Sequence, residues 1–497
     1  MFAIFLGMLD AQIVATALPR IVGDLGGLDV FAWVTTAYII ASSVTTPLYG
    51  KLSDIFGVKN VFLAAVAIFI AGSAACGLAQ SIGQLIAFRT LQGIGAGGLF
   101  VSVLAIIGSL FTPREGARYY GLFGIVFAAS ALIGPAAGGV LTDVISWHWV
   151  FFINLPVGLV VLFLISRFLR LPSRPGRAKI DYAGFVTLAG AVVIATLLTS
   201  WGGVSYSWLS PQILGLGAGF VVLTAAFVAI ERKAAEPVIP LHIFRDRTFT
   251  LCCLLSIVAG MVFLGAVNFL ALYVQVVTGA SPSMSGLVLL PMMLGLVVSS
   301  VGSSKLIART GRYKLYPVLS MSLGIVAAVL LSTMDTGTPR WLAIVYMVIF
   351  GLAAGLNMQV LTMASQNTAP RADLGAVSAS VTFARQLGSS VGISLFAAVF
   401  YGRLTDELAE RVPPGALDAT DPDSLSSQQV LDRLAAPVRH AVEQSYADSL
   451  TAVFHTAIPV LAVALVCALM LKNIPLRSQD HDTSDTRGQT SEPSGTH

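Results

Sequence analysis

Charged residues are scarce in this chain: Asp, Glu, Lys and Arg together make up only 11% of it, against about 25% in an ordinary soluble domain. Hydrophobic residues make up 56%. A soluble protein of 497 residues could not cover its surface with so few charges, so lipid must surround most of the chain. The composition therefore predicts an integral membrane protein.

Several chemical signatures are absent as well. The pattern G-x-x-x-x-G-K-[ST] of ATP-binding loops does not occur. The net charge is only +4, and the basic residues sit in short loops and not in a stripe, which argues against a nucleic-acid partner. No metal-ligand cluster, nucleophile–base pair or soluble catalytic domain is visible, so we expect neither an enzyme nor a bound cofactor or metal. The cysteines all lie in apolar runs and are expected to be core residues: Cys76, Cys252, Cys253 and Cys467.

Long apolar runs are what the sequence has in abundance. A membrane-spanning helix needs about 20 apolar residues, and runs of that length recur between polar or turn-rich breaks. We expect no cleavable signal peptide here, because the first run has no preceding basic residues and no small-residue cleavage site of the usual kind. We predict an all-α membrane protein with fourteen spans at 1–22, 30–50, 59–78, 84–107, 119–142, 150–169, 181–200, 212–231, 249–273, 285–304, 315–334, 341–363, 374–400 and 450–472.

The basic residues give this map an orientation, since Lys and Arg accumulate in cytoplasmic loops. With both termini inside, 21 of the 29 basic residues fall in the inside loops and tail. Six fall outside, and four of those six belong to one long loop, where the rule is weak. Arg89 and Arg385 fall within spans. We therefore expect a multi-pass protein of the cytoplasmic membrane with both ends in the cytoplasm.

Two segments are not predicted to span. The outside loop 402–448 is expected to contain a short amphipathic helix that lies either on the surface or against the bundle. The tail 473–497, rich in Ser, Asp, Thr and Gly, is expected to be disordered. Apolar residues recur at helical spacing within the loop at Val430, Leu431, Leu434, Val438, Ala441 and Val442.

An internal repeat suggests how the spans are grouped. "GKLSDIFG" (50–57) and "SKLIARTG" (304–311) share the pattern K-L-x-x-x-x-G, and each follows the second span of its half. Duplicated six-span halves are a common transporter architecture. We predict a six-helix bundle at 1–170, two inserted spans with linkers at 171–248, and a second six-helix bundle at 249–472.

Five motifs occur in order along the first half. They are "LDAQIVATALP" (9–19), "GKLSDIFGVKN" (50–60), "RTLQGIGAG" (89–97), "GPAAGG" (134–139) and "WHWVFFINLPVG" (147–158). With them the chain resembles the major facilitator superfamily, and in particular its fourteen-span drug:proton antiporter branch of multidrug and antibiotic exporters. Three residues depart from the family patterns: Gln12 replaces Thr, Val58 stands where a basic residue is common, and His148 replaces Arg.

The resemblance also bears on the abrupt beginning of the first span. Members of the family have a polar lead-in there, so two alternatives stay open: an upstream start codon or a minimal N-terminus.

Asp10 is the first candidate functional residue. A carboxylate near the middle of the bilayer costs at least about 2.5–3.5 kcal/mol unless it is neutralised or faces water. A group that can be neutral in one state and ionised in another is what proton coupling requires. The alternative is a structural acid tied to a neighbouring helix.

Arg89 is its candidate partner. Guanidinium does not release its proton, so Arg89 can only stabilise a carboxylate or a bound anion; the alternative is a packing arginine. The two residues lie about 9 and about 18 Å below the outer surface, which leaves a direct pair open. Arg385 is expected to be the corresponding charge of the second half or a structural residue.

Asp54 is a candidate gating residue. It is expected to pair either with Arg118 or with a helix N-terminus of the other half, and so to latch the inner side; the alternative is a solvated turn residue. The resemblance extends this gating role to Gly50, Gly57 and Lys59. The antiporter motif contributes Gly134 and Pro135, expected to kink the fifth span, and Gly138 and Gly139, expected to allow close helix contact.

For the substrate cavity the candidates are polar residues in otherwise apolar spans, each of which could instead join helices: Gln92, Asn268, Gln275, Asn357 and Gln359. Such a cavity suits a lipophilic compound, cations included. The second half has no acid in mid-span, so dications are not expected. Together these features predict a monomeric, proton-driven exporter of lipophilic molecules. The alternative is uptake or exchange of a metabolite.

Overall fold

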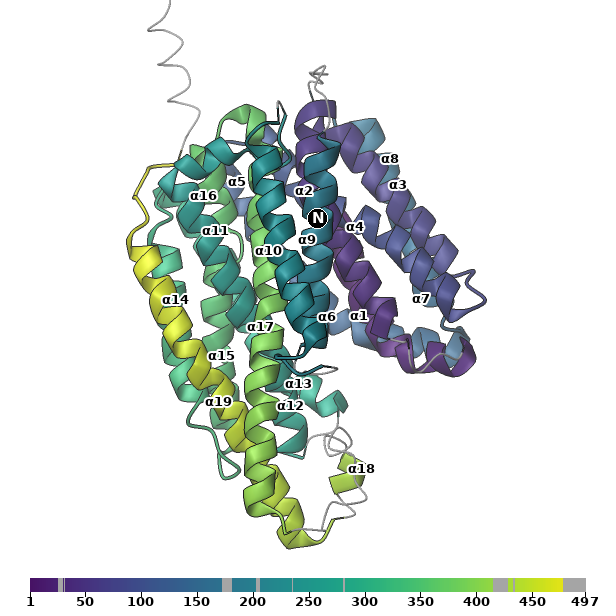
Figure 1. The fold of residues 1–497 in the computed structure, drawn as a ribbon. Coiled ribbons are helices and arrows are strands. Elements are labelled where there is room, and N and C mark those ends of the chain that lie inside the picture. Colours follow the sequence, from purple (N-terminus) through teal and green to yellow (C-terminus); the bar gives the residue numbers. More distant parts are fainter. Residues whose placement is uncertain are drawn as a thin grey trace, which may run out of the picture.

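The computed structural model describes residues 1–25, 30, 32–171, 181–202, 206–234, 236–279, 282–413, 428–431 and 434–476. Within them the fold is helical, apart from one isolated bridge between Gly202 and Tyr206. Figure 1 shows long helices standing side by side, with α3, α4, α7 and α8 on one side and α11, α14, α15 and α16 on the other.

The helices of the first half and of the two additional spans follow the apolar runs closely. They are α1 (Phe2–Leu25), α2 (Ala32–Phe56), α3 (Val58–Cys76), α4 (Ile82–Leu110), α5 (Pro113–Tyr120), α6 (Leu122–Val140) with the π-helical turn η1 (Leu141–Ile145), α7 (Trp149–Phe152), α8 (Asn154–Phe168), α9 (Tyr182–Trp201) and α10 (Pro211–Glu231).

The second half repeats this pattern with more interruptions. Its elements are the 3₁₀ turn η2 (Leu241–Arg245), α11 (Arg247–Ala259), the π-helical turn η3 (Gly260–Leu264), α12 (Val267–Val276), α13 (Pro282–Thr310), α14 (Leu315–Leu331), α15 (Arg340–Asn357), α16 (Val360–Thr368), the 3₁₀ turn η4 (Arg371–Asp373), α17 (Leu374–Arg411), α18 (Gln428–Leu431) and α19 (Ala436–Leu469).

Each predicted span coincides with helical structure. Among the described residues, eleven helices are long and apolar enough to cross a membrane, and shorter apolar helices occupy 2–18 and 315–331. The helix α2 is outside both groups because Thr, Ser and Tyr residues are distributed along it and lower its hydropathy. The fold is thus an all-helical membrane bundle, and the number fourteen stays a prediction.

The internal repeat has a structural counterpart. Gly57 and Gly311 close the two K-L-x-x-x-x-G segments, and both have positive φ, 85° and 69°. This backbone conformation favours glycine because a side chain would clash there. The two segments lie at what we call the loop-motif end of the bundle, the end that contains residues 50–57 and 304–311. The division of the chain at 170 and 248 stays a prediction.

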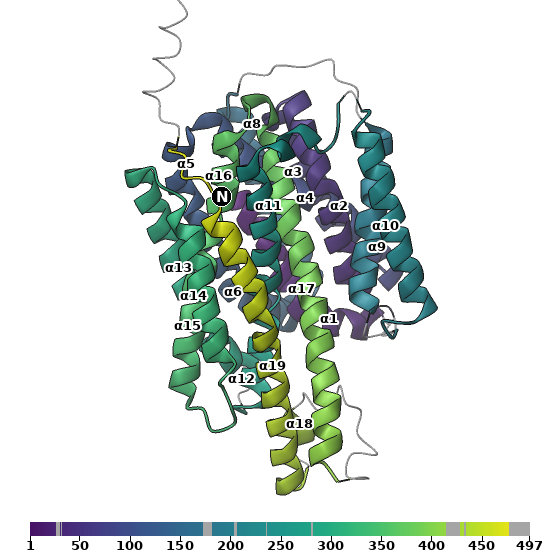
Figure 2. The same ribbon diagram turned by 60° about the vertical axis from the view of Figure 1, so that its left-hand side comes forward.

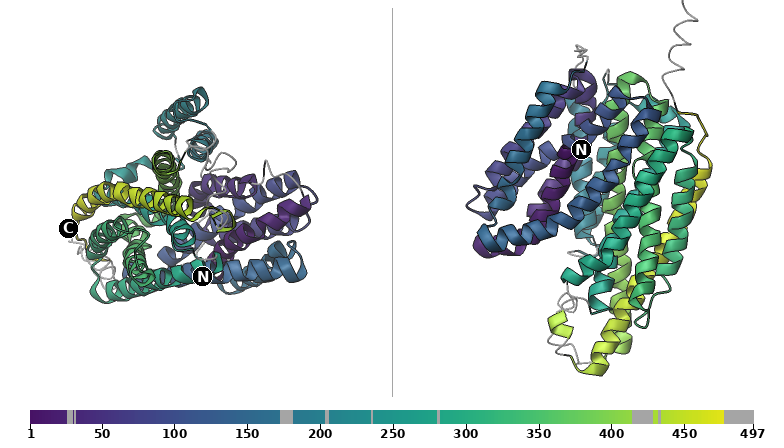
Figure 3. Two further views of the ribbon diagram at one scale, coloured as in Figure 1. Left: turned by 90° about the horizontal axis from the view of Figure 1, so that it is seen from below. Right: turned by 180° about the vertical axis from the view of Figure 1, so that it is seen from behind.

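The additional helices α9 and α10 pack against each other at the side of the bundle (Figure 2; Figure 3 gives the end-on view). α9 contacts α2 of the first half and α17 of the second. Two hydrogen bonds fix the α17 contact: Thr199 Oγ1 lies 2.9 Å from Ser390 Oγ, and Ser394 Oγ donates to the Thr199 carbonyl at 2.5 Å. The pair therefore touches both halves.

The prediction for residues 402–448 needs correction. α17 continues to Arg411 and α19 begins at Ala436, so both helices extend beyond the predicted spans and pack on each other. Val438, Ala441 and Val442 belong to α19, with Val442 fully buried. Arg411 ties the extension together by ion pairs to Glu407 (2.9 Å) and Asp448 (2.6 Å). Of the two alternatives, this part of the stripe packs against the bundle and does not lie on the surface; what differs from the prediction is that it belongs to the long helix α19 and not to a short separate helix.

The other predictions for this region concern Val430 and Leu431, which lie in α18, and the tail. Leu431 is fully buried. Leu434 lies between α18 and α19. Residues 477–497 lie outside the described residues, and so does most of the segment between Arg411 and Ala436.

Close packing of α1 and α6 depends on Gly138, one of the two glycines predicted to allow it, and also on Gly134, which was predicted only to kink the span. A Cβ at Gly134 would collide with Gln12, and one at Gly138 would collide with Thr16 Oγ1 and lie 2.8 Å from the Ile13 carbonyl. Gly139 faces open space, with no atom within 4 Å of a Cβ built there. The expectation that Gly139 also admits a helix is therefore wrong, because it points away from α1. The helix α6 runs through Pro135.

These neighbours give a matched test. We expect Gly138→Ala to destabilise the protein by about 1–3 kcal/mol, since overpacking forces α1 away from α6. Gly139→Ala should leave stability unchanged or slightly higher, because alanine favours helix and meets no neighbour. Thermal unfolding of the purified variants in one detergent measures both. Equal midpoints for the two variants would contradict the assigned packing.

Candidate functional site

The carboxylate of Asp10 lies at the centre of a buried polar network between four helices. Its side chain is fully buried in α1. Oδ2 accepts a hydrogen bond from Arg89 Nη1 of α4 at 2.7 Å. Oδ1 accepts from Gln92 Nε2 at 2.8 Å and from Asn154 Nδ2 of α8 at 2.6 Å. Three donors thus satisfy a carboxylate that is removed from water.

The question of a direct pair between Asp10 and Arg89 is settled by these distances. Arg89 is 1% exposed, so it does not snorkel toward the surface. Its guanidinium also donates to Gln92 Oε1 at 2.7 Å and lies 4.0 Å from the ring centroid of Tyr38. The long side chain of Arg89 spans the difference in depth that separates the two backbones. A buried pair of this kind is strongly destabilised when only one partner is removed.

Sequence reasoning missed one residue of this network and misplaced another. Asn154 bridges the Asp10 carboxylate and Ser73 Oγ, which lies 3.0 Å from its Nδ2. The "INLP" part of the fifth motif was the available signal for Asn154. Gln92 was predicted to line the substrate cavity, but it is fully buried against Asp10 and Arg89. Its i+3 spacing from Arg89 brings its amide onto the face that carries the carboxylate.

A second site closes the loop-motif end. Asp54, at the end of α2, accepts hydrogen bonds from the backbone N–H groups of Gly375 and Ala376, both at 2.9 Å. These are the first residues of α17, so the carboxylate meets a helix N-terminus, where the helix dipole favours negative charge. Gly50 lies one turn earlier on α2, and a Cβ there would lie 2.7 Å from the Gly375 carbonyl.

Of the two partners predicted for Asp54, the structure has the helix N-terminus and not Arg118. Arg118 is exposed and donates to its neighbour Tyr119 (Nη2–Oη 2.9 Å). Arg114 instead joins the halves, donating to the carbonyls of Ala308 (3.0 Å) and Arg309 (2.7 Å). Gly57, with its positive φ, separates the helices α2 and α3. Lys59 Nζ donates to the Ser166 carbonyl within the first half at 2.9 Å.

Further contacts at this end bind the halves together. Tyr120 Oη donates to Gln366 Oε1 of α16, and Gln366 Nε2 donates to the Leu104 carbonyl at 3.2 Å. Lys51 pairs with Glu236 at 2.6 Å, which ties α2 to the segment after α10. The structure is therefore one in which the loop-motif end is closed.

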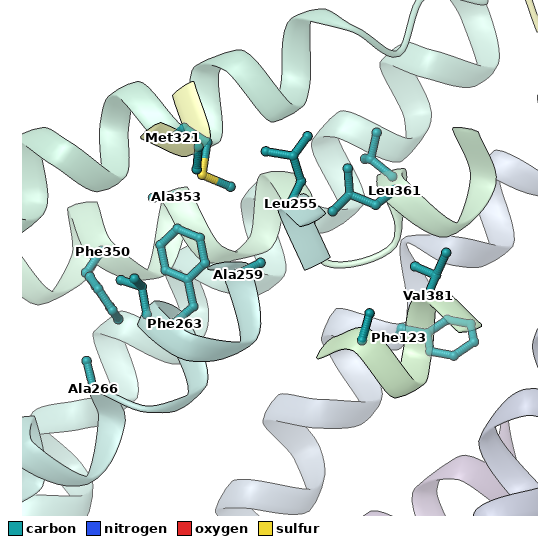
Figure 4. Packing of buried hydrophobic residues seen from close by; sticks show 14 of the residues in the cluster. Phe123, Leu255, Ala259, Phe263, Ala266, Met321, Phe350, Ala353, Leu361 and Val381 are labelled. Carbon is teal, nitrogen blue, oxygen red and sulfur yellow. The ribbon is translucent and has the colours of Figure 1, made fainter. Parts of the chain in front are cut away.

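A cavity of about 270 Å³ lies between the two halves. Met8, Phe100 and Phe127 line it from the first half, and residues of α11, η3, α13, α15, α16 and α17 line it from the second. Its wall is mostly aromatic and aliphatic. Figure 4 shows two of its aromatic residues, Phe263 and Phe350, packed edge to face with ring centroids 5.4 Å apart.

Only one of the predicted cavity residues lines this cavity, and that is Asn357. Asn268 is exposed on α12, and Gln275 is half-buried on the same helix. Gln359 is buried where the helix breaks between α15 and α16. Sequence alone could not separate these residues, because each is a polar group in an apolar run and only the helix rotation decides which faces the cavity.

Arg385 does line the cavity, from α17. Its Nη1 donates to the Met358 carbonyl, and its guanidinium lies 5.8 Å from the ring centroid of Phe100. In the described part of the chain no carboxylate lies within 4.0 Å of it. Arg385 therefore differs from Arg89, whose charge is compensated by Asp10.

The contact made by Asp54 predicts a pH-dependent latch. Burial raises the pKa of Asp54 from 3.8 to about 7, against the smaller opposing effect of the two backbone donors. The latched state thus holds the proton more tightly than a state with Asp54 in water. The stability that Asp54 gives the latched state, relative to a state with Asp54 in water, is greatest below about pH 4. It declines as the pH rises to about 7 and is constant above that.

We expect the latched population to fall severalfold between about pH 5 and about pH 8. Spin labels attached at two exposed positions of the loop-motif end, Asn60 and Arg312, report the distance between the halves by pulsed electron paramagnetic resonance. In Asp54→Asn, which cannot ionise, the distance distribution should no longer change with pH. A pH response of equal size in this variant would assign the effect to other groups.

Comparisons with known proteins agree with this architecture. The family model of the Major Facilitator Superfamily matches residues 1–393. An uncharacterized MFS-type transporter of Mycobacterium tuberculosis is 39% identical over 98% of this chain and 70% of its own length. The multidrug transporter protein MdtP of Bacillus subtilis is 35% identical over 96% of this chain and 92% of its own.

Among solved structures, the human organic anion transporter MFSD10 (TETRAN) superposes with a TM-score of 0.60, covering 92% of this chain and 98% of the other. At 15% identity this likeness shows the fold alone. The family match and the identities to bacterial transporters show more: this chain belongs to the Major Facilitator Superfamily.

Proposed function

We propose that this protein is a proton-coupled antiporter that exports lipophilic small molecules across the cytoplasmic membrane. The observation that carries the proposal is the buried Asp10 carboxylate, held by Arg89 beside a largely apolar cavity between the two halves. Relatives named multidrug transporter and multidrug resistance protein in Bacillus subtilis, each 35% identical, support export as the direction.

Asp10 is the proposed proton site, because a carboxylate in a membrane core exists either paired with a cation or protonated. In the structure it is ionically paired and sealed from water. Protonation would remove the charge that holds Arg89. Gln92 and Asn154 could rearrange around the neutral acid, since an amide offers both donor and acceptor atoms. The proton would thereby change the packing between α1, α4 and α8.

The latch at the loop-motif end supports alternating access. By the distribution of basic residues, this end is the proposed cytoplasmic side and both termini face the cytoplasm. The contacts of Asp54, Arg114 and Gln366 hold the halves together there. Opening toward the cytoplasm would require breaking them, and the cavity would then receive substrate. Each of these contacts between the halves is weak enough to break and re-form during a transport cycle.

The driving force in this scheme is the proton motive force, worth about 2.3 kcal/mol per charge per 100 mV plus the pH gradient. No bound cofactor or catalytic step is needed. We propose that the working unit is a monomer, since the cavity lies between two halves of one chain.

The test is transport in inside-out vesicles from cells that lack other exporters. Asp10→Asn keeps the size of the side chain but cannot carry a proton, so active accumulation of a lipophilic substrate should fall to the background level. Wild-type accumulation should collapse with a protonophore. Asp143→Asn is the matched control, because Asp143 is exposed on η1 and no hydrogen bond or ion pair joins it to the described residues of the network.

Two outcomes would count against the proposal. Active accumulation that persists in Asp10→Asn would remove this carboxylate from the coupling step. Accumulation in right-side-out vesicles, with none in inside-out vesicles, would favour the alternative of proton-linked uptake or exchange.

A further inference from the structure

The wall of the central cavity is chemically one-sided. Most of its surface comes from aromatic and aliphatic side chains, whereas most of its polar groups gather on α15, α16 and α17 of the second half. The groups on these helices are Asn357, Thr362, Thr382, Arg385 and Gln386, and Ser256 of α11 is a further polar lining residue. No Asp or Glu is among the residues that line it. A bound molecule would therefore meet hydrogen-bonding groups and positive charge on one side and apolar surface elsewhere.

The polar groups have unused hydrogen-bonding capacity. In the described part of the chain, no partner exists for either side-chain atom of Asn357, for Thr362 Oγ1, for Arg385 Nη2 or for Gln386 Oε1. Asn357 is 3% exposed and Thr362 is 1% exposed. Buried polar atoms are rarely left without partners. Their concentration on one wall of a cavity indicates a built recognition site for a ligand.

The charge of Arg385 specifies the kind of ligand. Guanidinium stays protonated at all relevant pH values, and an unpaired charge in a low-dielectric environment is unfavourable. Arg89 of the first half already has Asp10 at 2.7 Å. In the described part of the chain, the contacts of the Arg385 guanidinium are a hydrogen bond to a carbonyl and an aromatic ring, with no carboxylate within 4.0 Å. A negatively charged group on the ligand would supply the missing counter-charge, whereas a cation would be repelled.

We propose that the cavity binds amphipathic organic anions: an aromatic or aliphatic body of modest size that carries one carboxylate or sulfonate. Arg385 Nη2, Asn357 Nδ2 and Thr362 Oγ1 donate to the acidic group. Phe100, Phe263 and Phe350 contact the body. This inference rests on the proposed export function and replaces the expectation that cations are among the substrates.

The proposal assigns proton coupling and substrate selection to different charged residues, which the sequence alone did not distinguish. Asp10 and Arg89 form a closed pair without capacity for a ligand, and so they serve proton coupling. Arg385 serves substrate selection. Outward movement of an anion and inward movement of a proton shift charge in the same direction, so a membrane potential that is negative inside would drive both.

Binding of three compounds that share one ring system tests the charge preference: naphthalene-1-acetate, naphthalene-1-acetamide and 1-naphthylmethylammonium. Equilibrium dialysis uses the full-length protein in an uncharged detergent. We expect wild type to bind the acetate at least about tenfold more tightly than the ammonium compound, because charge-assisted hydrogen bonds are the stronger ones. Affinity for the neutral amide should lie between the two.

Arg385→Gln should lower the affinity for the acetate about tenfold or more and leave that for the amide nearly unchanged. Gln386→Glu places a carboxylate next to Arg385 and should also abolish the preference, even if Arg385→Gln fails to fold. Arg20→Gln is the control, since the Arg20 side chain is 70% exposed. Equal binding of anion and cation by wild type, or an unchanged preference in folded Arg385→Gln or Gln386→Glu, would overturn the proposal.

The dialysis measurement is independent of transport. Asp10→Asn should retain the anion preference while losing active accumulation. Anion binding without Asp10-dependent transport would refute the proposed function alone. Asp10-dependent transport with preferential binding of the cation would refute this inference alone.

Discussion

The burial of one carboxylate is the constraint on which the first half of this protein depends. Asp10 sits where an isolated charge is expensive, and its partners come from helices far apart in sequence: Arg89 and Gln92 on α4 and Asn154 on α8. Each donor must reach the same two oxygen atoms, so the rotation of three helices is coupled to one charge. The glycines of α6 then allow α1 to keep that position.

The same physical logic operates differently in the two halves. In the first half, the cation is neutralised within the protein, and the network is saturated apart from one oxygen of Asn154. In the second half, Arg385 faces a cavity among polar atoms that have no hydrogen-bond partner within the described residues. Between the halves, the N-terminus of α17 donates two hydrogen bonds to Asp54, which offset only part of the cost of burying its charge. Compensated charge holds the bundle, and uncompensated charge leaves room for a ligand.

Much of the fold followed from composition and periodicity. Apolar runs located helices at every predicted span, since backbone groups in lipid must be satisfied within the helix. The motifs identified the family and the residues Asp10, Arg89 and Asp54. The sequence did not predict the full length of α17 and α19. Both helices continue beyond the apolar runs because they pack on each other. The prediction that Gly139 allows close helix contact was wrong for a related reason, since adjacent residues on a helix point in different directions.

What the sequence determined by itself was the membrane environment, the helical architecture, the family and the presence of charged residues that could not be tolerated without partners. The tertiary structure decided who those partners are. It gave Asp10 a direct arginine, gave Asp54 a helix terminus in place of Arg118, and moved Gln92 from the cavity into the buried network. The reason is geometric: hydropathy fixes how deep a residue lies along a helix, whereas its partners depend on helix rotation and on contacts between distant segments.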